Sequence, residues 1–509
     1  MISSLVWVGK GCAQEVPERV KLTDDEFERI SKQMTVHLAE ARQDLDECTQ
    51  EEEEESMEEN EATVEPIDET GVNDDLAIYN LDSYDDDAAI DQDGVPTNGH
   101  IPLFSNIQGL SYHCTNEEDP YVQRADCDDE QEELEELRID ANDNLIVAAK
   151  TEDGISQIEV YVYETKEDNV YVHHDILIPS FPLCLEWLSF PLDQKKTSGN
   201  YVAVGTFEPQ VEIWDLDCID AMFPQCILGD KSSEELPTGK KKKKKTNALR
   251  HIDAVMAIAW NPSQPNLVAT GSADSTVKLW DLRQPATAVA NYTHHTDKVQ
   301  AVAWNPAEHT VLLTGAYDKK IFAFDSRSTD KTSCWTLNSD VECLIWDPHH
   351  PERFIVSTED GLVRCFDGRN ASLSPIFTLN AHDAPVSSLH INPFIDGCLV
   401  TGSADKHVKV WSMQDTTKIA CVVSRDIGAG KVFAASFSPD APFILSVAGS
   451  KGKVVVWNLQ DNAGVRKHFP VRQNEQEEAG RKEIVAVESD ASVSDDESMD
   501  EDWEDAPDV

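Results

Sequence analysis

A twelve-residue stretch recurs almost unchanged in the second half of the chain and constrains the fold more than any other feature. The segment 270–281 reads TGSADSTVKLWD, and it returns at 401–412 as TGSADKHVKVWS. Weaker copies lie between and beyond these two. The aromatic residues that end the copies are 42 to 46 residues apart: Trp280, Phe324, Phe366, Trp411 and Trp457. A strand-rich unit repeated at this period indicates a chain built from many similar small sheets.

The residues of each unit indicate blades of a β-propeller of the WD-repeat type. Runs such as Leu267-Val268-Ala269-Thr270 are rich in β-prone residues and are bounded by Gly, Pro and Asp turns. Two looser units precede the five clear ones, within 145–163 and 185–215. Seven units predict an all-β fold, a seven-bladed WD-repeat β-propeller, over residues 134–472. This fold rarely carries chemistry, so the function must be argued from its surfaces.

Two units contain a complete set of polar residues for a buried hydrogen-bond chain. A His precedes the first strand, an Asp lies in the tight turn, and a Trp ends the unit, with a strand Ser or Thr between them. The sets are His251, Asp274 and Trp280 with Ser272 or Thr270, and His382, Asp405 and Trp411 with Ser403 or Thr401. A repeated trio argues against a Ser-His-Asp catalytic group, which occurs once in an enzyme. We therefore predict no catalytic residue and no enzyme.

Three other units depart from this pattern. One keeps His295 and Asp318 but has Phe324 in place of the Trp, so its chain is incomplete. The unit after it and the last unit lack the His. We expect these two blades to be stabilised more by packing than by polar networks.

The charge is extreme and unevenly distributed. The chain has 509 residues and a formal net charge of −54, with acidic blocks before residue 134 and after residue 488. Such segments contain too little apolar surface to offset chain entropy, which predicts disorder. We expect an N-terminal extension, 1–133, with an amphipathic helix at about 24–45, and a disordered acidic tail, 473–509. An acidic surface favours basic protein partners and disfavours direct contact with a phosphate backbone.

The closure of the ring is open from sequence alone. Ser4 to Val8 resemble a lone strand that needs a sheet edge, either on the propeller or on a partner. The outer strand of the last blade can come from Pro120 to Gln123, within a ring-closing segment at 101–123, or from Val465 to Val471 folding straight back. We favour the first, because joining the chain ends would tie the ring shut.

Targeting and modification patterns lie outside the blades. A loop at 229–250 contains six consecutive lysines, which predict a nuclear import signal or an RNA contact: Lys240, Lys241, Lys242, Lys243, Lys244 and Lys245. Candidate phosphorylation sites are serines with an acidic residue three places on: Ser56, Ser492, Ser494 and Ser498. A phosphoprotein of the nucleus is therefore expected.

The cysteine and histidine patterns give no metal site. Twelve Cys are scattered without Cys-x-x-Cys pairs, which, with no signal peptide or long apolar run, predicts a reduced, intracellular, soluble protein. Three His-His pairs occur, at 173–174, 294–295 and 349–350. Neighbouring strand residues face opposite sides, so each pair should offer at most one ligand. We predict no metal, no cofactor, no small-molecule substrate and no membrane contact.

Two further patterns concern partners. Asp253 and Asp297 precede strands at the expected top of the ring, where they could face a basic peptide. Trp280-Asp281-Leu282-Arg283 matches part of the receptor box of cullin-type ubiquitin ligases, although an Arg that pairs locally and covers a blade edge explains it as well.

The beginning of the chain and one internal segment resemble the periodic tryptophan protein family. These features are Met1-Ile2-Ser3 with Trp7-Val8, the segment Asn116-Glu117-Glu118-Asp119-Pro120-Tyr121, the spaced Trp-Asn-Pro marks and the acidic Ser-rich tail. The resemblance implies a nucleolar protein in ribosomal RNA transcription and processing, mainly in large-subunit assembly, with a chromatin association.

The predicted function is accordingly a non-enzymatic scaffold in nucleolar ribosome biogenesis. Its partners would be assembly factors, ribosomal proteins or pre-rRNA particles. One alternative is a chromatin-associated protein that binds histones, and a lesser one is a substrate receptor of a cullin-type ubiquitin ligase.

Overall fold

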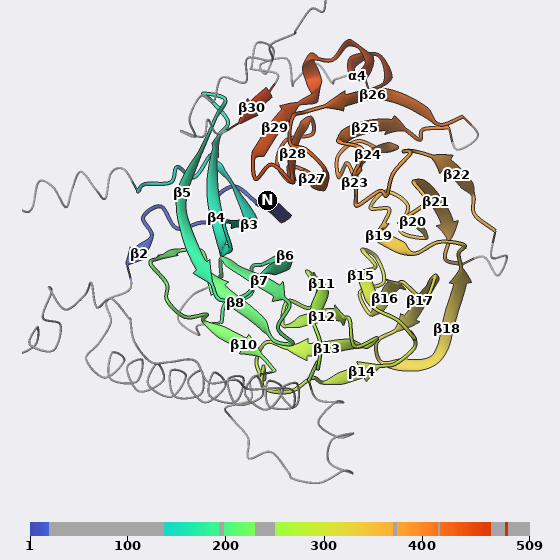
Figure 1. Ribbon diagram of the computed structural model, residues 1–509, viewed down its shortest axis with the longest axis horizontal. Helices are drawn as coiled ribbons and strands as arrows, with labels where there is room; N and C mark the ends of the chain where they lie inside the picture. Colours follow the sequence, from blue (N-terminus) through green and yellow to red (C-terminus); the bar gives the residue numbers. More distant parts are fainter. Residues whose placement is uncertain are drawn as a thin grey trace, which may run out of the picture. The chain divides into compact units, whose positions relative to one another are not determined.

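The described part of the chain forms seven four-stranded antiparallel sheets in a ring (Figure 1). The structure is a computed structural model, and it describes residues 1–19, 137–192, 198–229, 250–369, 374–415, 418–469 and 484–486. All of these belong to one compact unit of the chain. The predicted seven-bladed all-β propeller is confirmed.

Each sheet is one blade, and its strands run in order from the centre of the ring outward. The blades are β1 (Ile2–Val8), β3 (Asn144–Glu152), β4 (Ile155–Glu164) and β5 (Asn169–Ile178) in blade 1; β6 (Pro182–Leu188), β7 (Tyr201–Thr206), β8 (Val211–Asp215) and β10 (Cys226–Leu228) in blade 2; β11 (Val255–Trp260), β12 (Leu267–Ser272), β13 (Val277–Asp281) and β14 (Ala290–Tyr292) in blade 3; β15 (Val299–Trp304), β16 (Val311–Ala316), β17 (Lys320–Asp325) and β18 (Ser328–Thr336) in blade 4; β19 (Val341–Trp346), β20 (Arg353–Thr358), β21 (Leu362–Asp367) and β22 (Phe377–Asn380) in blade 5; β23 (Ser388–Ile391), β24 (Cys398–Gly402), β25 (His407–Ser412) and β26 (Ala420–Asp426) in blade 6; and β27 (Val432–Phe437), β28 (Ile444–Gly449), β29 (Val454–Asn458) and β30 (Ile484–Ala486) in blade 7.

The first residues of the chain supply the inner strand of blade 1. β1 pairs antiparallel with β3 from Ile2 opposite Lys150 to Val8 opposite Leu145. Ile2 and Val8 are fully buried, and β1 contacts the inner strands of both neighbouring blades, β6 and β27. The sequence analysis left open whether this strand docks on the propeller or on a partner. It closes the ring.

The outer strand of the last blade comes from neither predicted segment. Val455 to Trp457 pair with Ile484–Ala486, and Val465 lies in a short helix, α4 (Ala463–His468), preceded by a 3-10 turn, η4 (Leu459–Asp461). The predictions of Pro120 to Gln123 and of Val465 to Val471 as this strand are therefore wrong. The predicted propeller limits of 134–472 also leave out β1 and β30, because a blade can take a strand from a distant part of the chain.

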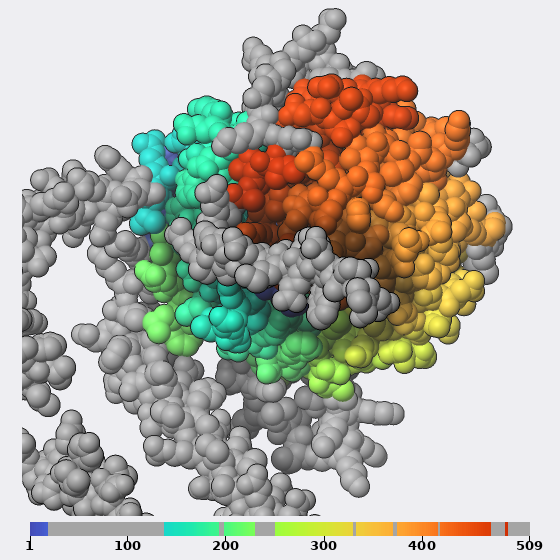
Figure 2. Space-filling model, turned by 45° about the horizontal axis from the view of Figure 1, so that its top comes forward, coloured from blue at the N-terminus to red at the C-terminus, as the bar shows by residue number. Residues whose placement is uncertain are grey.

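Blades 7 and 1 lie side by side where the ring closes. In the space-filling view, the red residues of the last blade lie beside the blue-green strands of the first (Figure 2). Asp440 of blade 7 accepts hydrogen bonds from the Lys10 backbone N–H at 2.8 Å and from Asn144 Nδ2 at 2.7 Å. One carboxylate thus holds both chain segments of blade 1 at the seam.

A Trp at or near the end of several inner strands explains part of the repeat in physical terms. In three blades its indole N–H donates to a backbone carbonyl in the inner strand of the preceding blade. These pairs are Trp7 with Ser436 at 3.1 Å, Trp304 with Ala259 at 3.0 Å and Trp346 with Ala303 at 3.4 Å. A large apolar ring thereby packs between blades while its one polar atom is satisfied.

The Asn that directly follows the inner strand in blades 3, 4 and 6 faces the other way. Its Nδ2 donates to a carbonyl in the next blade, in the pairs Asn261 with His309 at 2.7 Å, Asn305 with Pro351 at 2.8 Å and Asn392 with Pro442 at 2.6 Å. In blade 4, Trp304 and Asn305 therefore join the blade to both of its neighbours. These loops lie on what we call the bottom face of the ring, and the turns before each inner strand lie on the top face.

The described residues on either side of the long segment between β1 and β3 lie close together. A short strand, β2 (Glu18–Arg19), pairs in parallel with β9 (Cys218–Ile219), and Ile139 N–H donates to the Glu15 carbonyl at 2.9 Å. The described residues that flank 20–136 are therefore held next to each other. The predicted helix at 24–45 and the segment 101–123 lie outside the described residues, as does the tail 473–509 apart from 484–486.

Candidate functional site

The predicted polar residues of blade 3 form one continuous hydrogen-bond chain. His251 Nδ1 lies 3.0 Å from Asp274 Oδ2, and His251 Nε2 lies 2.7 Å from Thr270 Oγ1. Trp280 Nε1 donates to the same hydroxyl at 2.8 Å. Of the two hydroxyls left open by the sequence, Thr270 is therefore the member of the chain. Ser272 instead accepts from Asp274 N–H and donates to the Asp253 carbonyl, each at 3.1 Å.

Blade 6 repeats this geometry, and blade 4 contains part of it. His382 lies 2.7 Å from both Asp405 and Thr401, and Trp411 donates to Thr401 at 3.0 Å. In blade 4, His295 Nε2 lies 2.9 Å from Thr314 Oγ1 and Nδ1 lies 3.2 Å from Asp318, but Phe324 has no N–H to offer.

Blade 5 builds a different polar network in the same place. Arg364, only 9% exposed, donates to Thr358 Oγ1 at 3.0 Å and to Asp360 at 3.2 Å. The guanidinium thus replaces the missing His as the partner of the turn Asp. Blade 5 therefore contains a polar network, in a blade where packing was expected to contribute more than polar networks.

These chains are built to hold strands together rather than to react. The Thr270 and Thr401 residues are 0% exposed, and each hydroxyl is bonded between a His and a Trp. Burial would raise the pKa of Asp274, but hydrogen bonds from His251 and Thr276 outweigh burial and lower this pKa to about 2. A hydroxyl that no substrate can reach cannot act as a nucleophile, so the trios are structural.

The top face gathers acidic side chains between blades 4 and 5. Asp297 precedes β15, Asp340 and Glu342 lie where β19 begins, and Glu359 follows β20. Glu359 N–H donates to the Asp340 carbonyl at 3.1 Å. We call these four residues the top-face acidic cluster. The predicted Asp253 and Asp297 are both exposed on this face, each before an inner strand.

The electrostatics of this cluster favour a cation. Burial, Glu359 and Asp340 raise the pKa of Glu342. Burial and all four acidic residues of the cluster raise the pKa of Tyr317 to about 12. The one basic residue paired here is Lys319, whose Nζ lies 3.9 Å from Asp340 in the part of the chain that the structure describes. A bound positive charge would relieve this mutual repulsion.

The arginine of the receptor-box pattern, Arg283, and the arginines at the same place in blades 4 and 5, Arg327 and Arg369, contact their own surroundings. Arg327 pairs with Asp325 at 2.8 Å, and Arg369 pairs with Asp367 at 3.2 Å. Both side chains are more than 70% exposed, so these pairs contribute little to stability. Arg283 lies 6.0 Å from the centre of the Phe190 ring. This arrangement supports the local interpretation of these arginines.

One His pair departs from its predicted geometry. His173 is an extra residue in a β-bulge, since Val160 pairs with His174 and Tyr161 with Val172. The two Nδ1 atoms therefore lie 2.8 Å apart instead of on opposite sides of the strand. No group of three or more His, Cys, Asp or Glu side chains within the described ranges is arranged to hold a metal ion.

Other predicted residues lie outside the described part of the chain. These are the lysines 240–245 and the serines at 56, 492, 494 and 498. Among the helices that the structure describes, none combines the length and apolar character needed to span a bilayer.

Fold and surfaces together define a WD-repeat scaffold protein, a ring whose faces contact other proteins. The family profile described as WD domain, G-beta repeat matches residues 243–281, 286–325, 373–412 and 422–458. These are the units of blades 3, 4, 6 and 7. The three inner strands of blade 5, with Arg364 in place of the His, lie outside the matched residues.

Full-length relatives then identify the family. Periodic tryptophan protein 1 of Saccharomyces cerevisiae is 35% identical over 92% of this chain and 90% of its own length. An uncharacterized WD repeat-containing protein of Schizosaccharomyces pombe is 43% identical over 98% of this chain and 96% of its own length. A periodic tryptophan protein 1 homolog of Drosophila melanogaster is 29% identical over 92% of this chain and 96% of its own. The chain belongs to the periodic tryptophan protein 1 family.

Proposed function

We propose that this scaffold acts in ribosome biogenesis in the nucleolus, holding ribosomal proteins or assembly factors on its top face. The observation that carries the proposal is the top-face acidic cluster on a chain of formal net charge −54. Ribosomal proteins are basic, and an acidic surface competes with nucleic acid for them. The family resemblance supplies the nucleolar setting and the emphasis on the large subunit.

Affinity purification from nuclear extract, with and without RNase, tests this function. Large-subunit assembly factors and ribosomal proteins should remain bound in both cases, because the contact is with protein. Replacing Glu342 and Glu359 by Gln should reduce their recovery, and removing one exposed charge on the outer strand of blade 1, with Asp175→Asn, should not. Loss of all these proteins after RNase treatment would contradict the proposal.

Histone binding is the second candidate, because a histone tail offers the same basic chemistry to Asp253 and Asp297. Purified histones should then bind in a salt-sensitive manner and compete with ribosomal proteins. A histone-only set in the purification would favour this function over ribosome assembly.

We further propose that the lysine run 240–245 is a nuclear import signal and that Ser56, Ser492, Ser494 and Ser498 are phosphorylated. Replacing the six lysines by Gln should move a fluorescent fusion out of the nucleus. Mass spectrometry of the native protein tests the serines, and an unmodified tail would contradict their assignment.

A further inference from the structure

One backbone position recurs in blades 2 to 7, and in blade 5 the residue at this position is a glycine. The position is the first residue after the third strand. Its backbone N–H donates to the carbonyl of the residue just before the second strand, at 2.7 to 2.9 Å. The shared hydrogen bond shows that these six residues are structurally equivalent: Leu216, Leu282, Ser326, Gly368, Met413 and Leu459.

At four of these positions an apolar side chain fills the gap to the preceding blade. Leu216, Leu282, Met413 and Leu459 are at most 8% exposed. Leu282 lies in one core cluster with Ile213 of blade 2, and Leu459 lies in one with Val410 of blade 6. At the Ser326 position, the Tyr292 ring of blade 3 reaches across, and its hydroxyl donates to the Ser326 carbonyl at 2.6 Å.

Blade 5 has no such side chain, because the residue is Gly368. The residue that occupies the Ile213 and Val410 position on the opposite side, in blade 4, is Ala323. Both sides of the interface between blades 4 and 5 are thus truncated relative to the other interfaces. The result is a cavity of about 460 Å³, which we call the interblade pocket.

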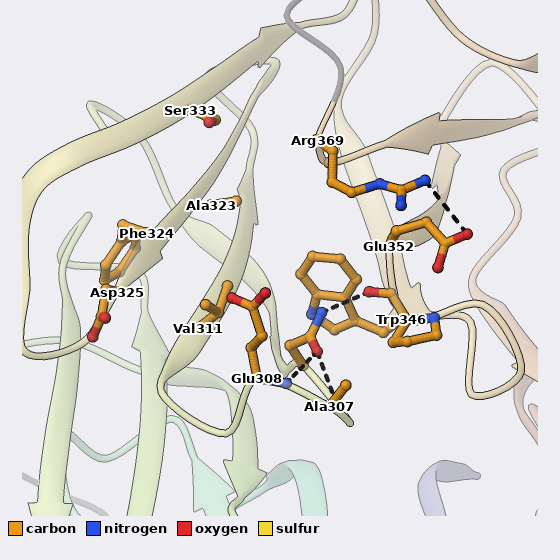
Figure 3. A pocket seen from close by; sticks show the side chains of 13 residues that line it. Ala307, Glu308, Val311, Ala323, Phe324, Asp325, Ser333, Trp346, Glu352 and Arg369 are labelled. Atoms are coloured by element: carbon orange, nitrogen blue, oxygen red, sulfur yellow. Dashed lines mark hydrogen bonds and ion pairs between the residues drawn. The ribbon is translucent and has the colours of Figure 1, made fainter.

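Apolar side chains form part of the wall of the interblade pocket (Figure 3). Trp346 lies on one side and Ala323 on the other, with Val311 between them. The Phe324 ring instead packs against Tyr292 of blade 3, with the ring centres 4.8 Å apart. A Cβ added at Gly368 would meet two carbons of the Trp346 ring at 3.7 Å and the Glu352 carbonyl at 3.5 Å, which are ordinary contacts. The space is therefore shaped for the aliphatic side chain that the other blades provide themselves.

The mouth of the pocket is acidic. Glu308, Asp325 and Glu352 line it, with Arg369 as the one cation among the lining residues. Arg369 is already shared between Asp367 at 3.2 Å and Glu352 at 3.6 Å. Asp325 is paired with Arg327 at 2.8 Å, so three lining carboxylates face two guanidiniums, and the rim keeps a net negative charge. A negative rim beside apolar groups complements an apolar side chain with basic neighbours.

We propose that the interblade pocket binds a segment of a partner protein that presents a Leu- or Met-sized side chain flanked by Lys or Arg. The aliphatic side chain takes the place left by Gly368 and packs on Trp346. The basic neighbours pair with Glu308 and Glu352 at the rim. The inference adds a bottom-face contact to the proposed scaffold and assumes only that the scaffold binds proteins.

Fluorescence anisotropy with two labelled peptides tests the proposal on the purified full chain. The peptides are Gly-Lys-Arg-Leu-Lys-Arg-Gly and the same sequence with Gly in place of Leu. The Leu peptide should bind at least tenfold more tightly, because it alone buries a large apolar side chain. Gly368→Leu should reduce its affinity to that of the Gly peptide, and Glu308→Gln should weaken both peptides together.

Matched variants separate this effect from a general loss of structure. Gly368→Ala fills only part of the pocket and should give intermediate discrimination. Ser326→Ala changes the equivalent position of blade 4 and should leave discrimination intact. Equal affinities for the two peptides, or full discrimination by Gly368→Leu, would overturn the proposal. So would a dimer in light scattering that Gly368→Leu disperses, since a second copy would then fill the pocket. Neither result depends on the ribosome-assembly experiment.

Discussion

At the scale of single residues, the Thr270 hydroxyl shows how one buried group can serve two hydrogen-bond partners. Its hydroxyl is fully buried and is shared by His251 and Trp280, and neither of these groups has water as an alternative partner. Removing such a hydroxyl leaves two buried polar groups unsatisfied. In blade 4, Phe324 replaces the Trp, so the Thr314 hydroxyl has one side-chain partner, His295 at 2.9 Å, besides the Phe322 backbone carbonyl at 3.5 Å.

This difference gives a matched pair of mutations. Thr270→Val should lower the free energy of unfolding by about 2–4 kcal/mol, because His251 and Trp280 both lose a hydrogen-bond partner. Thr314→Val should lower it by about 1–2 kcal/mol, because only one side chain, His295, loses a partner. Denaturant unfolding of both variants measures the difference. Equal losses would show that the Trp bond contributes nothing.

His174 should make stability depend on pH. Burial, with His173 beside it, lowers the pKa of His174 to about 4, whereas an unfolded histidine titrates near 6.5. Between these values the unfolded state binds more protons. The stability gained by burying the neutral ring is therefore present above pH 6.5 and lost as the pH falls toward 4, by up to about 3 kcal/mol.

His174→Gln should remove this part of the acid sensitivity. The free energy of unfolding of the variant should fall less steeply between pH 6.5 and pH 4 than that of the unmodified chain. Replacing the exposed His309 by Gln is the control and should leave the slope unchanged. A His174→Gln slope equal to that of the control would contradict the assignment.

Residue patterns predicted which side chains lie together, but they predicted less well which atoms form the hydrogen bonds. The His, Asp and Trp of blades 3 and 6 lie together as the spacing indicated. The choice of Thr over Ser depends on which side of the strand each faces, and the pattern left it open. The bulge at His173 adds one residue to a strand, which no periodicity in the sequence marks.

At the scale of elements, the tight turns between the second and third strands share one conformation. The residue after the turn Asp adopts a positive φ in blades 3, 4, 5 and 6: Ser275 (64°), Lys319 (63°), Gly361 (79°) and Lys406 (71°). Only glycine adopts this region without a steric cost.

Exchanges at these turns should have opposite signs. Lys406→Gly should raise the free energy of unfolding by about 1 kcal/mol, because it removes the strain of a left-handed residue. Gly361→Ala should lower it by more than that, since a Cβ there would lie 2.1 Å from the His382 carbonyl oxygen. Thermal unfolding of both variants provides the measurement, and a destabilising Lys406→Gly would contradict this account of the turns.

The elements that sequence analysis placed wrongly are those that do not repeat. The period located blades 3 to 7 because each ends its third strand with an aromatic residue, Trp or Phe, at a regular spacing. The outer strand β30 is three residues long and follows a helix, so it has neither mark. The pocket at Gly368 was not predicted. Comparing the residues at the six equivalent positions in the sequence would have found the glycine.

At the scale of the whole molecule, a ring must join its first and last blades. The interface between these two blades is the weakest one unless further contacts hold it. Here β1 comes from the start of the chain and the rest of blade 1 follows after residue 143. Asp440 of blade 7 binds both segments, and Trp7 donates to Ser436 of the same blade. The integrity of every binding face therefore depends on a strand of seven residues.

Native-state hydrogen exchange of the full chain tests this central claim most directly. Mass spectrometry of the peptide covering residues 1–10 should show the amides of β1 exchanging as slowly as those of the inner strand β27, because both are paired and buried in one closed ring. Exchange of these amides within seconds, while β27 stays protected, would mean that the N-terminal strand does not close the propeller.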